Sequence, residues 1–103
     1  MVTQQTAINT VRAFVQDCNA IGLSFDKVLL FGSYARNTAH EGSDIDLLLI
    51  SKKFKDDIFA NLKQYAKINI RYPLVETHPY SFEQFVEGDE FIAQVIKECI
   101  EIS

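Results

Sequence analysis

The sequence contains little cysteine, histidine, glycine or proline. Its two cysteines, Cys18 and Cys99, both fall in apolar helical stripes, so we expect small core residues rather than a disulfide framework. Two histidines, His40 and His78, are too few for a histidine-based zinc site, and no Cys-x-x-Cys pair exists. No low-complexity linker is visible, and 103 residues fit one domain, which we place at residues 1–103.

Long apolar runs are also missing. None approaches the roughly 20 residues that a membrane-spanning helix needs, and the first residues lack the basic and apolar regions of a signal peptide. We therefore expect a cytoplasmic protein that does not bind a membrane. The net charge of −4 argues against a nucleic acid as the main partner, because such binders usually carry a basic stripe. Apolar residues make up 48% of the chain, which is typical of a globular domain.

The first half of the chain predicts one helix and two strands. Hydrophobic spacing indicates a helix over about Thr6–Ile21, with Ile21 on its apolar face and Gly22 as its end. The short runs Val28–Phe31 and Leu47–Ile50 are typical of strands buried on both faces.

The middle of the chain predicts a helix and a third strand. The helix lies within Asp56–Lys67, and the strand lies within Ile68–His78. Pro73 interrupts the second segment, which indicates an edge strand, a bulge or two short pieces.

The last quarter carries clear helix signals. Ser81 and Gln84 form a capping-box pattern, so a short helix should begin at Ser81 and end near Gly88. Asp89 can cap a final helix. Its buried face is predicted to contain Phe91, Ile92, Val95, Ile96, Cys99 and Ile100. Alternating helices and strands predict a small mixed sheet covered by helices.

Two acidic residues precede the second apolar run. Side chains alternate along a strand, so Asp44 and Asp46 should point the same way while Ile45 points into the core. Carboxylates roughly 7 Å apart along a strand can jointly hold a hard cation, and Mg²⁺ prefers such oxygens together with substrate phosphates. An Asp-x-Asp by itself is more typical of a solvated strand end or a helix cap.

A glycine and a serine supply the second half of the pattern. Gly32 ends the first apolar run, and glycine lets backbone approach a phosphate closely. Ser33 is placed to begin a helix through Tyr34 and Arg36 whose free N–H groups would face phosphates. The Gly-Lys-Ser/Thr ending of a P-loop is absent. We interpret Gly32 and Ser33 as an anion-binding turn.

Together these segments resemble a known family. Gly32-Ser33, ten further residues and then Asp44-Ile45-Asp46 look like the signature of the DNA polymerase β-like nucleotidyltransferases. The extended pattern over 31–50 is most similar to the minimal nucleotidyltransferases, which are commonly paired with HEPN-domain toxins. The resemblance implies an α/β (α+β) fold with a small mixed sheet flanked by helices. It also implies Mg²⁺-dependent transfer of a nucleotidyl group, adenylyl above all, from ATP or another nucleoside triphosphate.

The family also carries a third carboxylate on a later strand. Glu76 is the candidate here, because strand-forming residues surround it in the last extended segment. The resemblance therefore implies a catalytic, metal-binding set of Asp44, Asp46 and Glu76. It implies a nucleotide-binding set of Gly32, Ser33 and Arg36.

Several alternatives stay open at this level. Arg36 is either a phosphate contact or a structural partner for nearby carboxylates. Asn37 stands where many relatives have glycine, but asparagine tolerates a left-handed backbone. We interpret His78 and Pro79 as a bend before Ser81 rather than as catalytic residues. The acceptor of the transferred group is a partner toxin in one interpretation. In the other, the protein is a non-catalytic antitoxin that keeps the fold.

Overall fold

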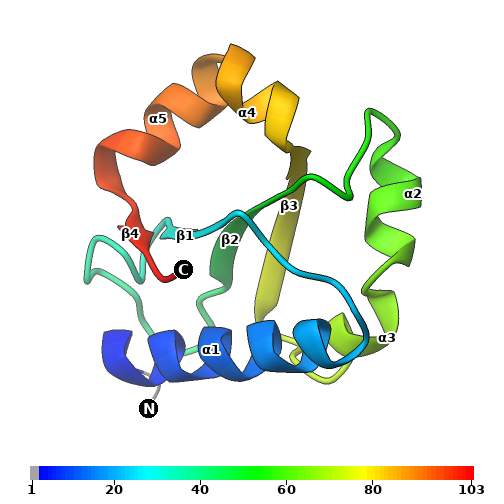
Figure 1. The fold of residues 1–103 in the computed structure, drawn as a ribbon. Helices are drawn as coiled ribbons and strands as arrows, with labels where there is room; N and C mark the ends of the chain where they lie inside the picture. Colours follow the sequence, from blue (N-terminus) through cyan, green and yellow to red (C-terminus); the bar gives the residue numbers. More distant parts are fainter. Residues whose placement is uncertain (1–2) are drawn as a thin grey trace.

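The computed structural model describes residues 3–103 and shows a four-stranded sheet with helices on both faces (Figure 1). The strand order is β3-β2-β1-β4. Strand β1 (Lys27–Phe31) runs antiparallel to β2 (Ile45–Ser51) and to the short β4 (Ile100–Glu101), and β2 is parallel to β3 (Val75–Ser81). The predicted mixed sheet flanked by helices is confirmed. Met1 and Val2, part of the domain predicted over 1–103, lie outside the described residues.

Helix α1 (Gln4–Ala20) covers one face of the sheet (Figure 1). It begins two residues before the predicted start, because the Thr3 side chain accepts from the Thr6 N–H and the Thr6 hydroxyl accepts from the Thr3 N–H. This reciprocal capping satisfies two otherwise free donors. Ile21 was predicted to extend the apolar face, but it lies beyond the helix end and is 56% exposed. Among residues 3–103, no helix is long and apolar enough to cross a bilayer.

The main core lies between α1 and the sheet. Alternate strand residues, namely Val28, Leu30, Ile45, Leu47, Leu49 and Val75, meet the buried side chains of α1. Phe14 is fully buried there and makes edge-on contacts with Tyr65 and Tyr72 at centroid distances of 6.0 and 5.7 Å. Cys18 is also fully buried, as predicted.

The helix predicted within Asp56–Lys67 is two helices. Helix α2 (Ile58–Lys63) begins at Asp57, whose carboxylate accepts from two backbone N–H groups, and α3 (Ala66–Asn69) follows after a break. Tyr65 lies at that break and is 1% exposed, with its hydroxyl 2.8 Å from that of Thr77. Burying this ring against Phe14 takes precedence over a continuous helix.

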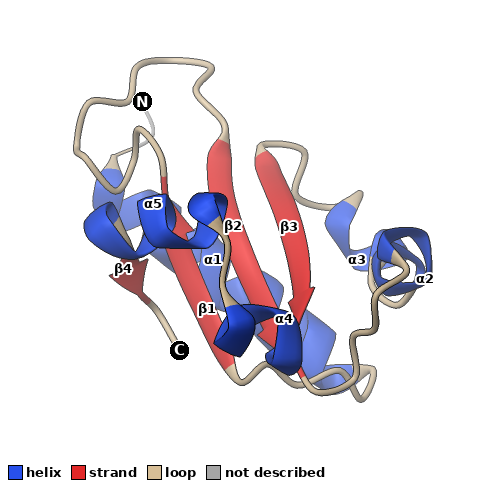
Figure 2. Cartoon of the chain, turned by 90° about the horizontal axis from the view of Figure 1, so that it is seen from above, coloured by secondary structure: helices blue, strands red, loops and turns tan. Residues whose placement is uncertain are grey.

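Helices α4 (Phe82–Glu87) and α5 (Glu90–Glu98) cover the other face (Figure 2). The predicted Ser81–Gln84 capping box and the Asp89 cap are both present. The buried face of α5 is narrower than predicted and consists of Ile92 and Val95. The other members of the predicted stripe are Phe91, 36% exposed, Ile96, 54% exposed, Cys99, half-buried beyond the helix end, and Ile100, which belongs to β4.

Strand β3 lies at the edge of the sheet. An edge strand was one of the alternatives predicted for the segment that Pro73 interrupts. Its position along the chain differs from the prediction, because Ile68 and Asn69 belong to α3 and the strand begins after Pro73. It continues through His78 and Pro79, which pair in register with Leu48 and Leu49. The predicted bend at His78-Pro79 is therefore wrong.

Candidate functional site

The acidic residues gather at the end of the sheet where β2 and β3 begin. Asp46 is the register partner of Phe31 on β1 and of Glu76 on β3. Glu76 therefore lies directly beside Asp46 on the same face. The same alternation that buries Ile45 and Leu47 under α1 places Asp46 on the α4–α5 face.

Asp44 lies one residue before β2 and is exposed. Ile45 between the two aspartates is 1% exposed, so the predicted alternation holds. Asp44 is close enough to raise the pKa of Asp46, but its carboxylate is not part of the tightest ligand group. That group is Asp46, Glu76 and His78, each of which offers one ligand atom within 4.8 Å of the others.

Crowding of negative charge changes the chemistry of Asp46. Burial raises the pKa of Asp46 to about 6, and the Glu76 and Asp44 carboxylates add to the rise. The guanidinium of Arg36 acts in the opposite direction. Arg36 is paired with Glu98, so a divalent cation would supply a counter-charge of its own to these carboxylates.

The backbone of Gly32 lies in close contact with the side chain of Asp46. Its φ is +77°, and a Cβ built on it would lie 2.2 Å from Oδ2 of Asp46. Glycine is therefore required here for its backbone conformation and also for the close approach of the carboxylate. The Gly32 bend thus lies against Asp46 in the structure, as the prediction for this residue required.

The segment after Gly32 is a single turn rather than the predicted helix. The Arg36 N–H donates to the Gly32 carbonyl, and then Asn37 adopts a φ of +59°. The Asn37 and Thr38 N–H groups donate back to the carbonyls of Tyr34 and Ser33, at 3.3 and 2.9 Å. This is the hydrogen-bond pattern of a helix C-terminus, so the left-handed Asn37 ends the turn at once. The tolerance predicted for asparagine is confirmed.

Contacts from both helical layers hold this turn. The Gln4 side chain of α1 donates to the Tyr34 carbonyl at 2.9 Å. The Arg36 guanidinium donates to both carboxylate oxygens of Glu98 on α5, at 3.0 and 3.2 Å. Of the two interpretations of Arg36, the structure thus contains the structural contact, in which the guanidinium is paired with the Glu98 carboxylate. Ser33 is half-buried within the turn.

His78 is the site residue that sequence reasoning missed. It lies two residues after Glu76 on β3, so its side chain shares the face of Glu76. Phe31 and Phe91 surround its ring at centroid distances of 5.5 and 5.3 Å. Burial lowers the pKa of the imidazole, and the Glu76 carboxylate opposes that shift. The period-2 spacing already predicts that His78 shares the face of Glu76, but we interpreted His78 and Pro79 as a bend because of the proline.

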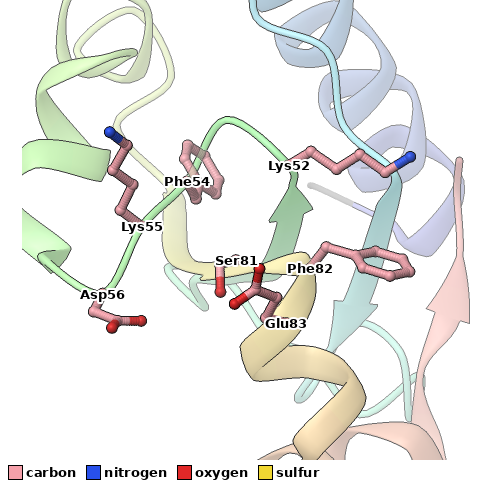
Figure 3. Close-up of a pocket in the computed structure, with 7 residues that line it drawn as sticks. All are labelled: Lys52, Phe54, Lys55, Asp56, Ser81, Phe82 and Glu83. Carbon is pink, nitrogen blue, oxygen red and sulfur yellow. The ribbon is translucent and has the colours of Figure 1, made fainter.

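A pocket of about 520 Å³ lies elsewhere, beyond the opposite ends of β2 and β3 (Figure 3). Phe54 and Phe82 line it, together with two basic residues, Lys52 and Lys55, and two acidic ones, Asp56 and Glu83. These charges balance, and no clustered ligand group like that at Asp46 occurs here among residues 3–103. The clustered ligand group lies instead near the start of β2 and β3.

Comparison with known proteins identifies the family of this chain. The model of the nucleotidyltransferase domain family matches residues 11–102. A curated relative in Methanocaldococcus jannaschii, named "Putative protein adenylyltransferase", is 49% identical over 87 residues. That match covers 73% of this chain and 58% of the relative, so the chain spans little more than half the length of that protein. This chain belongs to the nucleotidyltransferase domain family.

Solved structures share the fold. The crystal structure of "a putative nucleotidyltransferase from Sulfolobus solfataricus" superposes with a TM-score of 0.68, covering 95% of this chain and 80% of that one at 19% identity. A crystal structure described as "the toxin-antitoxin with AMP-PNP" gives a TM-score of 0.62 over 93% of this chain and 72% of that one, also at 19% identity. At such identities these likenesses establish the architecture alone.

Proposed function

We propose that this protein transfers a nucleotidyl group, adenylyl in the first place, from ATP or another nucleoside triphosphate to an acceptor on a partner protein. Family membership gives the reaction class. The observation that carries the proposal is the fit of Asp46 against Gly32 and Glu76, which places a carboxylate pair directly beside the backbone turn that begins at Gly32. Nucleotidyl transfer needs both parts, one for cations and one for phosphates.

The residues present suit a divalent cation. Asp46 and Glu76 would hold Mg²⁺, with Asp44 at the exposed side of the pair. Bound there, Mg²⁺ would neutralise the charge on the triphosphate and polarise the α-phosphate towards attack by the acceptor hydroxyl. The crowding of negative charge at Asp46 supports this assignment, because a metal-free protein must hold these carboxylates together against their repulsion.

The turn after Gly32 would bind the phosphates. Gly32 leaves backbone space next to Asp46, and Ser33 adds a hydroxyl to the backbone donors of the turn. Arg36 is exposed on the same turn. Arg36 would reach the phosphates only after its contact with Glu98 breaks, so it would fill the structural role and the binding role at different times.

The acceptor we propose is a HEPN-domain toxin in the cytoplasm. This rests on the resemblance of the motif and on a structural neighbour described as a toxin–antitoxin protein. A hydroxyl of the toxin, such as that of a tyrosine, would attack the α-phosphate and release pyrophosphate.

A labelling experiment tests the proposal. The protein is incubated with α-³²P-labelled ATP, Mg²⁺ and a HEPN-domain toxin as the candidate acceptor, and label on the toxin is measured. Asp46→Asn should reduce transfer at least about 100-fold, the upper range for losing a group that supports a metal site. The matched control is Asp56→Asn, an exposed aspartate near the opposite end of β2, which should transfer normally.

The same experiment separates the enzyme from an antitoxin that acts by occlusion. Inhibition of the toxin without any transfer of label by wild-type protein would refute the proposed reaction. Unreduced transfer by a correctly folded Asp46→Asn variant would refute the assigned site.

A further inference from the structure

The strand that carries Glu76 brings a nitrogen ligand to the cation site. In addition to Asp46 and Glu76, the group of ligand atoms within 4.8 Å contains a ring nitrogen of His78. All three side chains come from adjacent strands and face the same side of the sheet. Their spacing is therefore fixed by the register of β2 and β3 rather than by a loop.

The surroundings of His78 restrict what its ring can do. Phe31 and Phe91 lie against it at 5.5 and 5.3 Å between centroids, and Phe91 also stacks with Tyr80 at 6.1 Å. These aromatic neighbours offer no hydrogen-bond partner at the ring faces, and they hold the imidazole beside the carboxylates. Gly32 adds an independent constraint, because only a residue without Cβ leaves Asp46 in place.

Divalent cations differ in how they respond to such a ligand set. Mg²⁺ takes oxygen ligands almost exclusively and gains little from an imidazole. Mn²⁺ and the later transition cations accept nitrogen and oxygen ligands together, with affinity rising along the series. A site of two carboxylates and one imidazole therefore discriminates by ligand type, although Mg²⁺ also fits the carboxylates.

We propose that His78 is the third ligand of this cation site, and that it makes the site select a divalent transition cation over Mg²⁺, with Mn²⁺ as the experimental probe. The inference rests on the proposed function, since it concerns the cation of the same site. It changes the expectation drawn from three carboxylates, because Glu76, Asp46 and His78 then form the inner group and Asp44 lies at its margin.

Pulsed electron paramagnetic resonance on the full chain with MnCl₂ alone tests the ligand directly. Bound Mn²⁺ in wild-type protein should show a nitrogen coupling, which should change when histidine is labelled with ¹⁵N. The chain has two histidines, so His40→Gln is the matched control and should keep the coupling. His78→Gln should remove it. Absence of the coupling in wild-type protein would overturn the assignment, whether or not any variant folds.

Affinities test the selectivity. His78→Gln should weaken Mn²⁺ binding about tenfold or more, the range expected when support for a metal is removed, while Mg²⁺ affinity from competition should change far less. An equal loss of affinity for Mn²⁺ and Mg²⁺ in His78→Gln would contradict the proposed role of His78 in cation selectivity. Asp46→Asn should weaken both. Label transfer by wild-type protein with Mg²⁺ reports on the proposed function separately. Label transfer in the absence of a nitrogen coupling would refute only the role proposed for His78. If no label is transferred with Mg²⁺ and none with Mn²⁺, the proposed function is refuted.

Discussion

The two faces of the sheet are built from the same strands but carry different kinds of residue. Towards α1, the residues of β2 are apolar from Ile45 through Leu47 to Leu49. Towards α4 and α5, the buried apolar strand residues are Leu29, Leu48 and Ile50, and Asp46 precedes them on β2. Strand alternation thus separates a face that stabilises the fold from a face that carries charge.

The comparison explains how a small domain can tolerate clustered carboxylates. Hydrophobic burial under α1 is continuous from α1 through α3, so the fold does not depend on the site end of the other face. The carboxylates of Asp46 and Glu76 are positioned by the register of β2 with its neighbouring strands. Changes on the two faces should therefore differ in kind, with stability lost on one and function lost on the other.

The largest stability effect is expected from Phe14→Ala on the α1 side. Phe14 is fully buried between two aromatic rings, and such truncations cost about 3–5 kcal/mol. Urea unfolding measures the loss, with Ile96→Ala as the control. Ile96 lies on α5 and is 54% exposed, so its truncation should change stability by only about 0.5 kcal/mol. Similar losses of stability for the two variants would contradict the proposed difference between the two faces.

Gly32→Ala should damage both fold and site. Its φ of +77° should cost about 1–2 kcal/mol, and its new Cβ would displace the Asp46 carboxylate. Gly42→Ala is a matched control, because Gly42 has a φ of +86° with no atom within 4 Å of the added Cβ. Unfolding and cation-binding titrations should show similar backbone strain in both but loss of cation binding only at Gly32. Equal cation binding by the two variants would remove Gly32 from the site.

Tyr34→Phe should increase stability slightly. Tyr34 is 1% exposed, and its hydroxyl has no hydrogen-bond partner among residues 3–103. Removing an unsatisfied buried hydroxyl should gain about 1 kcal/mol, measured as a higher urea midpoint. Tyr65→Phe is the matched contrast, because its hydroxyl is paired with Thr77 and its removal should destabilise. A clear loss on Tyr34→Phe would show that the hydroxyl has a partner in solution.

The cation-free protein should also show a pH dependence of its stability. The Asp46 pKa is raised to about 6, so the folded protein holds this proton more tightly than the unfolded chain. The resulting stability is present below about pH 4 and is lost as the pH rises through 6. Thermal unfolding in EDTA should show that the stability difference between wild type and Asp46→Asn follows this trend. A difference that does not vary over that range would contradict the raised pKa.

Features that depend on local patterns were largely predictable from the sequence. Gly22, Asp89 and the Ser81–Gln84 box mark helix ends in the chain itself, and they are confirmed. Gly32 and Asp46 were recognised from their spacing, and the pairing of β1 with β2 brings them together. Their roles in binding phosphate and cation stay predictions, as do those of Ser33, Asp44 and Glu76.

Features that depend on tertiary pairing were not predictable in this way. Strand β4 has two residues and exists because Ile100 and Glu101 pair with β1. The break between α2 and α3 depends on the burial of Tyr65. Proline usually interrupts strands, so the sequence pattern predicts a bend at His78, yet an edge strand accommodates Pro79. The sequence pattern indicated an edge strand as one alternative for the segment that Pro73 interrupts, but it did not show that the strand would continue through Pro79.

Pro79 has a consequence for how this molecule meets other proteins. It provides no N–H for a neighbouring chain, and the Val75 carbonyl on the same strand already accepts from Asn69. At the opposite border, β4 offers only two residues. Intermolecular strand addition is therefore disfavoured at both borders of the sheet. We therefore expect a partner protein to contact side chains of this domain rather than to add a strand to its sheet.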